Sequence, residues 1–169
     1  KLNTGHRSSW YALWLLGSQY ENKGRPDIPV LANAFKNGMP AMFIVNESPE
    51  MDTSDGRKIP GTLWLHDEDG MAAQYLPDRF PQVDIKPVKG ISIAHQDELY
   101  SLMQTNGEAR IRSTGTGWFG YAGNYDPFKP RFASRPDEVL INYTQRRMLW
   151  INKWLSRTYQ MDPDRVAIQ

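Results

Sequence analysis

The strongest constraint on the fold is a series of short, almost continuous apolar runs, separated by loops rich in glycine, proline and charged residues. Such runs are typical of strands that are buried on both faces, as in parallel sheets. The runs predicted as strands are residues 10–16, 41–46, 61–66, 88–94 and 166–168. They alternate with segments predicted as helices at 28–37, 71–76 and 137–158. This alternation predicts an α/β fold with a mainly parallel sheet and flanking helices.

The clearest of these helices is predicted over residues 137–158, with Ser134 as its capping residue. Apolar side chains recur there at helical spacing and predict a stripe that faces the core. Several basic side chains, Arg147 among them, are predicted to face solvent. The predicted stripe consists of Thr144, Met148, Ile151 and Leu155.

The composition excludes several classes of function. Among the 169 residues there is no cysteine, so disulfides, thiolate nucleophiles and cysteine-based zinc sites are absent. Lysine and arginine number 20 against 19 acidic residues, so the net charge is only +1 and nucleic acid is not a predicted partner. The longest apolar runs, residues 11–16 and 41–45, are too short for a membrane span.

Residues 104–136 show no sustained period and many glycines, prolines and aromatics, so we predict irregular structure and a binding surface there. Within this segment, Gly115–Gly120 matches the dinucleotide pattern G-x-G-x-x-G. That pattern requires a helix directly after it, and the sequence that begins at Tyr121 cannot open one. A glycine-rich loop that presents Trp118 and its aromatic neighbours is favoured, and no cofactor is predicted.

Three carboxylates adjoin an imidazole at His66–Asp69. Their spacing does not match a calcium loop, so a solvated turn is favoured and no metal site is predicted. A glycosidase pair of one of these acids with Asp97 or Glu98 is a weaker alternative, because sequence does not fix their separation. His95 is predicted to be a structural hydrogen-bonding group. The chain contains no G-x-S-x-G motif.

The closing segment, residues 143–169, resembles esterase-type α/β hydrolases. The similar members are the polyhydroxybutyrate-depolymerase and feruloyl-esterase-like group and the prolyl-oligopeptidase-like group. In that family a helix and an Asp-Pro-x-Arg-Val turn, here Asp162–Val166, lead into the central strand that ends in the nucleophile elbow. Leu63–His66 with Gly70 is similar to the strand and His-Gly turn that supply an oxyanion-hole amide. The resemblance covers roughly residues 60–169.

The resemblance implies a partial α/β-hydrolase fold that ends just before the nucleophile elbow. Residues 47–169 are then the N-terminal half of the catalytic domain, and residues 1–46 are early strands or the end of a preceding β region. The implied activity is serine-type hydrolysis of a small-molecule or polymeric ester, less readily of a peptide, through an acyl-enzyme. The nucleophile, acid and histidine of the triad would all follow Gln169, so no triad member is present.

For the site itself, the resemblance implies an oxyanion hole formed by backbone amides of Asp67 and Glu68, although Asp67 stands where the family usually has glycine. Trp118 and Tyr121 are predicted to line the substrate pocket. Two alternatives are a non-catalytic carbohydrate- or polymer-binding module that uses the aromatic loop 118–128, and an inactive hydrolase homologue. The sequence predicts no oligomeric state and no compartment, with secretion or a periplasmic location left open.

Overall fold

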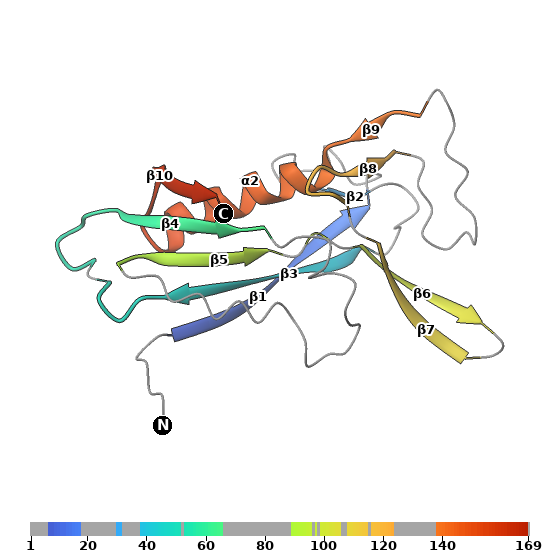
Figure 1. Ribbon diagram of the computed structural model, residues 1–169, viewed down its shortest axis with the longest axis horizontal. Helices are drawn as coiled ribbons and strands as arrows, with labels where there is room; N and C mark the ends of the chain where they lie inside the picture. Colours follow the sequence, from blue (N-terminus) through green and yellow to red (C-terminus); the bar gives the residue numbers. More distant parts are fainter. Residues whose placement is uncertain are drawn as a thin grey trace.

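The computed structural model describes residues 7–17, 30–31, 38–51, 53–65, 89–95, 97, 99–105, 108–114, 116–123 and 138–168 (Figure 1). The helix in these ranges is α2, Tyr143–Thr158. The longer strands are β1 (Arg7–Gly17), β3 (Met39–Glu47), β4 (Ile59–Trp64), β5 (Ile91–His95), β6 (Leu99–Thr105), β7 (Glu108–Thr114) and β10 (Met161–Ile168). Three two-residue strands are β2 (Val30–Leu31), β8 (Tyr121–Ala122) and β9 (Leu140–Ile141).

The main sheet has the strand order β10-β4-β5-β3-β1-β2. Strands β10, β4 and β5 are mutually parallel, whereas β3 runs antiparallel to both of its neighbours, β5 and β1. The expected mainly parallel α/β sheet with flanking helices, and with it the partial α/β-hydrolase fold, is therefore wrong. The described residues form a mainly β structure with a mixed sheet and a single helix.

The direction of β3 was not readable from its sequence for a physical reason. Most residues of Met39–Glu47 are buried, because β3 lies between two strands and both of its faces are covered. A strand buried in this way is apolar along its whole length whichever way it runs. Hydrophobic pattern therefore located the strand but did not distinguish a parallel from an antiparallel partner.

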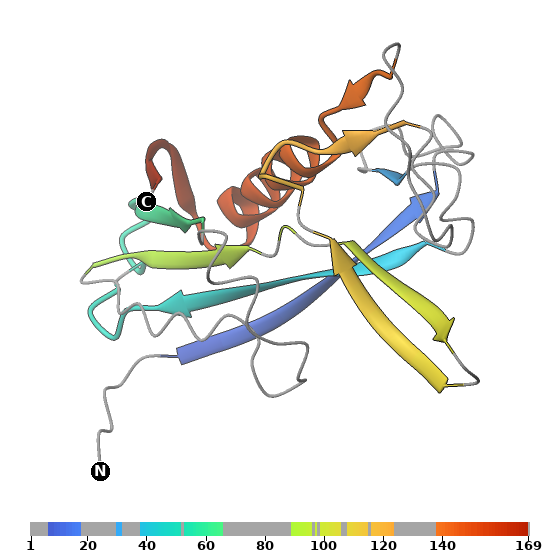
Figure 2. The same cartoon turned by 45° about the vertical axis from the view of Figure 1, so that its right-hand side comes forward.

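Helix α2 lies across one face of the sheet and forms the core with it (Figures 1 and 2). Ile151 and Leu155 of the helix pack on alternate residues of the sheet strands, such as Val45 and Ile93, all of them almost fully buried. Burial of each such side chain contributes about 1.5–3 kcal/mol. Tyr11 of β1 extends this core, because its ring stacks on Phe43 and meets Trp154 edge-on.

The helix begins later than predicted. Asn142 is the N-cap and makes no side-chain capping bond, so the predicted start at 137 and the Ser134 cap are wrong. Residues 140–141 instead form β9, paired with β8. The buried positions of the helix include Thr144, Ile151 and Leu155 of the predicted stripe, whereas Met148 is only partly buried. Arg147 is also buried rather than facing solvent.

Two further local predictions need correction. The segment 104–136 was predicted to be irregular, but it contains most of an antiparallel hairpin, β6–β7, which projects from the end of the main sheet (Figure 2). The helix predicted at 28–37 is contradicted at Val30–Leu31, which pairs as a short parallel strand beside β1. The helix predicted at 71–76 lies outside the described residues.

Strand β10 occupies one margin of the main sheet in the described part of the chain, where the resemblance implied a central strand. No helix in the described ranges is long and apolar enough to cross a bilayer.

Candidate functional site

The parallel strands bring several polar side chains to one edge of the sheet. Because β4, β5 and β10 run in the same direction, their carboxyl ends meet at the same edge (Figure 1). Ile168 of β10 pairs in register with Leu63 of β4, so the chain that leaves β10 does so beside the end of β4. The carboxyl ends of parallel strands are where binding and catalytic groups collect in such sheets.

Asp97, just after β5, is the central polar group at this edge. Its side chain is completely buried, and Oδ2 accepts hydrogen bonds from the backbone N–H of Thr116 at 3.1 Å and of Trp118 at 3.2 Å. Its other oxygen, Oδ1, is buried without a hydrogen-bond partner. A buried carboxyl group is costly unless it is hydrogen-bonded, so these two amides offset part of the cost of burying Asp97 and are themselves fixed by it.

A second set of bonds joins the same turn to the helix. The Thr116 hydroxyl donates to the backbone carbonyl of Asp97 at 2.9 Å, and the Thr116 and Thr144 hydroxyls are 2.7 Å apart. The backbone N–H of Gln145, in the first turn of α2, donates to the carbonyl of Phe119. This bond satisfies one of the amides that an N-cap side chain would otherwise satisfy. The turn thus caps the helix.

The backbone of this turn, Thr116–Gly120, adopts unusual conformations. Gly117 and Trp118 both lie in the left-handed region, with φ of 56° and 59°. For tryptophan this conformation costs on the order of 1 kcal/mol and needs support from its surroundings. Gly120 is required for close approach, since a Cβ there would lie 1.9 Å from the carbonyl oxygen of Ile141.

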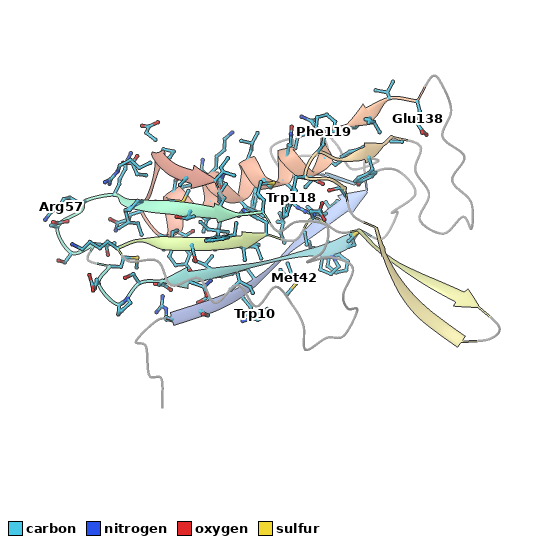
Figure 3. The ribbon with its side chains drawn as sticks, in the orientation of Figure 1. Trp10, Met42, Arg57, Trp118, Phe119 and Glu138 are labelled. Carbon is cyan, nitrogen blue, oxygen red and sulfur yellow. The ribbon has the colours of Figure 1, made fainter. Side chains whose placement is uncertain are left out.

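The aromatic side chains of the turn differ in exposure. Phe119 is 42% exposed and Trp118 is half-buried, near the carboxyl ends of β4 and β5 (Figure 3). Tyr121 is buried and stacks on Tyr143 with ring centroids 4.6 Å apart. The turn therefore presents an apolar surface to solvent, backed by a stacked aromatic pair.

His95, the last residue of β5, lies two residues before Asp97 and faces the helix. Burial, and then the positive charge of Arg147, lower the pKa of His95 from 6.5 to about 3. Its Nε2 is buried without a hydrogen-bond partner, and its ring lies 6.2 Å from that of Phe43. An imidazole this weakly basic is neutral at pH 7 and poorly matched to general-base work. No side-chain hydrogen bond of His95 is found among the described residues, so the structural hydrogen-bonding role stays a prediction.

The structure places only part of the predicted site. Asp67 and Glu68 lie outside the described residues, so the predicted oxyanion hole stays a prediction. Trp118 and Tyr121 lie in the turn and in the strand after it, and their substrate role also stays a prediction. Sequence reasoning missed Thr116 and the burial of Arg147. A signal for Arg147 existed, because it lies three residues after Thr144 and four before Ile151, a spacing that places it on the same helix face as these two stripe residues.

A separate polar pocket of about 320 Å³ lies at the opposite edge of the sheet. Arg7 pairs with Glu47 through two bonds, of 2.6 and 2.9 Å, and the hydroxyls of Tyr11 and Tyr159 are hydrogen-bonded to each other. Burial, followed by the bond to Tyr11, raises the pKa of Tyr159. Arg7 with Glu47 and Tyr11 with Tyr159 are therefore hydrogen-bonded pairs within the pocket lining.

Comparison of the sequence with protein-family models, with curated proteins and with solved structures finds no match. Among the described residues, no three His, Asp or Glu side chains are grouped closely enough to hold a metal ion. The geometry of the chain is therefore the basis for assigning a function.

Proposed function

We propose that this chain belongs to a serine-type hydrolase that cleaves esters, and less readily peptides, through an acyl-enzyme. The observation that carries the proposal is the unit of α2, the Asp162–Arg165 turn and β10. Asp162–Arg165 belongs to β10, and this unit directs the chain along the sheet margin toward the edge where the Thr116–Gly120 turn lies. The nucleophile, acid and histidine would be contributed by residues that follow Gln169.

The irregular first half of β10, between Met161 and Val166, has a well-defined structure that supports this. Asp162 accepts hydrogen bonds from the backbone N–H of Asp164 at 3.2 Å and from Nε of Arg165 at 2.7 Å. The Arg165 bond, then the Asp164 bond, lower the pKa of Asp162. Arg165 also donates to the carbonyl of Lys58, just before β4. The residues that carry the family resemblance thus fix β10 beside β4.

In the proposed reaction, the histidine takes the proton of the serine hydroxyl as the serine oxygen bonds to the ester carbonyl carbon. The carbon–oxygen bond to the alcohol then breaks, and the histidine returns the proton to the departing alcohol. Water hydrolyses the acyl-enzyme in the same way, releasing the acid and regenerating serine. Backbone amides of Asp67 and Glu68 would hold the developing oxyanion, and Trp118 and Tyr121 would contact the acyl or alcohol group.

The test is to label the full-length protein with a fluorophosphonate and to assay p-nitrophenyl ester hydrolysis. We expect one labelled serine, in a G-x-S-x-G motif after Gln169, and loss of label and turnover when that serine is changed to alanine. Residues 1–169 alone should be unlabelled and inactive. Full-length protein without label or turnover would exclude the proposal and leave an inactive homologue, and robust turnover by residues 1–169 would also contradict it.

The exposure of Phe119 favours one other candidate, a non-catalytic module that binds carbohydrate or another polymer through the aromatic loop 118–128. Aromatic side chains of this kind supply large apolar contact areas. A polysaccharide pull-down with wild-type chain and with Trp118→Ala separates the two functions. Binding that depends on Trp118, in a protein that no fluorophosphonate labels, would favour the module.

A further inference from the structure

Several hydrogen bonds from outside the Thr116–Gly120 turn hold its backbone in place. Asp97 accepts hydrogen bonds from two backbone amides of the turn. The Thr116–Thr144 and Gln145–Phe119 hydrogen bonds join the turn to α2. At the centre of this network stands Trp118, a non-glycine residue in the left-handed region. Residues in sparsely populated conformations persist only where their surroundings enforce them, and such sites are often binding sites.

We propose that Asp97 is a positioning residue that holds this turn as a rigid rim, on which Phe119 and Trp118 receive the uncharged apolar group of the ester. This inference rests on the proposed function and deepens it. Asp97 is completely buried and so does not itself touch substrate. It acts through the two amides that it fixes.

The chemistry of the rim selects the ligand. Phe119 and Trp118 supply apolar surface, and the Asp97 carboxyl that binds the turn is buried. An alkyl or aryl group gains from burial against these rings, whereas a charged group would lose hydration there. Because the turn is already ordered before binding, the ligand does not bear the entropic cost of ordering it.

The first experiment measures the order of the turn directly. In Asp97→Ala, hydrogen exchange at the amides of Thr116 and Trp118 should speed up at least tenfold, while the amides of Ile151 and Leu155 keep their protection. Asp55→Asn is the matched control, since Asp55 is an exposed carboxylate that also accepts a backbone N–H, from Arg57 at 2.9 Å. Unchanged exchange at Thr116 and Trp118 would overturn the positioning role.

The second experiment measures ligand binding by the 169-residue chain with saturation-transfer NMR. Benzyl butyrate and butyl butyrate serve as the aryl and alkyl probes, and ethyl acetate as the short one. We expect binding of the butyrates to weaken at least fivefold in Phe119→Ser and Thr116→Val and to recover in Thr116→Ser, which keeps the hydroxyl. Equal binding by wild type and Phe119→Ser would overturn the apolar rim.

The third experiment uses the full-length enzyme and separates this inference from the proposed function. For p-nitrophenyl octanoate, Asp97→Asn should raise KM several-fold with little change in kcat, because contacts made equally in substrate and transition state affect KM alone. The KM for p-nitrophenyl acetate should change less. A fall in kcat alone would overturn the inference. An inactive full-length protein whose 169-residue chain still binds the butyrates would exclude the proposed function and leave the rim intact.

Discussion

At the scale of single residues, the side chains with the clearest effects on loop structure and on pH-dependent stability are buried polar ones. Asp97 and His95 are both at most 1% exposed, and each leaves one buried polar atom without a partner. Asp97 offsets the free-energy cost of its burial by accepting hydrogen bonds from two backbone N–H groups. His95 avoids the cost of burying a charge by remaining neutral. The same desolvation thus fixes a loop at one position and creates a pH dependence at the other.

His95 should make the protein less stable in acid. The unfolded chain binds a proton on this residue below pH 6.5, and the folded chain does so only near pH 3, so protonation favours unfolding as the pH falls between these values. The contribution lost is about 1.4 kcal/mol per pH unit at most. Urea denaturation at pH 7, 6, 5 and 4 measures it. His95→Gln should show a shallower decline, and equal slopes for both proteins would contradict the assignment.

Gly120→Ala should lower the free energy of unfolding far more than Gly56→Ala does. A Cβ at Gly120 meets the backbone carbonyl of Ile141, which cannot rotate away, so we expect a loss of about 3 kcal/mol. Gly56→Ala is the control, because its Cβ would meet nothing within 4 Å and only its φ of 75° is unfavourable, costing about 1 kcal/mol. Denaturant midpoints compare the two, and equal losses would show that Gly120 has room.

At the scale of elements, the most informative unit is α2 with the strand that follows it. Arg157 lies in the last turn of the helix, where a positive charge is favourable, and β10 begins directly after Gln160 with a shift in register between Met161 and Val166. An ion pair as exposed as Asp162–Arg165 contributes little energy. The bond that joins this segment to the residue before β4 is the one that Arg165 donates to the carbonyl of Lys58.

The packing of α2 predicts unequal costs for two leucines on opposite faces. Leu155 is fully buried in the core, whereas Leu149 is 61% exposed. Leu155→Ala should lower the free energy of unfolding by about 2–5 kcal/mol, and Leu149→Ala by no more than about 0.5 kcal/mol. Chemical denaturation followed by circular dichroism measures both. Similar values would mean that α2 does not pack on the sheet through the face described.

At the scale of the whole molecule, exposed apolar side chains lie both on β1 and beside α2. Trp10 and Trp14 of β1 are each more than half exposed, and Figure 3 shows Trp10 at β1, away from α2. Beside the helix, Leu149 and Ile168 are also exposed, and β10 is a sheet margin in the described part of the chain. An edge strand with exposed apolar residues promotes pairing between molecules.

We expect the 169-residue chain to self-associate as its concentration rises, mainly through β10. Ile168→Lys should reduce this association, because a charge on an edge strand opposes strand pairing. Leu149→Lys is the matched control, with similar exposure on a helix rather than on a strand edge. Analytical ultracentrifugation over a concentration series measures both variants. Equal reductions in association by the two variants would mean that exposed apolar area, rather than pairing through β10, drives the association.

By itself, the sequence located the longer strands of the main sheet and most of the long helix with three residues of its buried stripe, because periodicity and apolar runs are local properties of the chain. Tertiary structure alone decided the direction of β3, since a strand with both faces covered is apolar whichever way it runs. It alone buried Arg147 and joined Asp97 to Thr116, a bond between residues that are distant in sequence and have no shared local pattern. Contacts of that kind depend on which elements become neighbours, and that choice is made only when the whole chain packs.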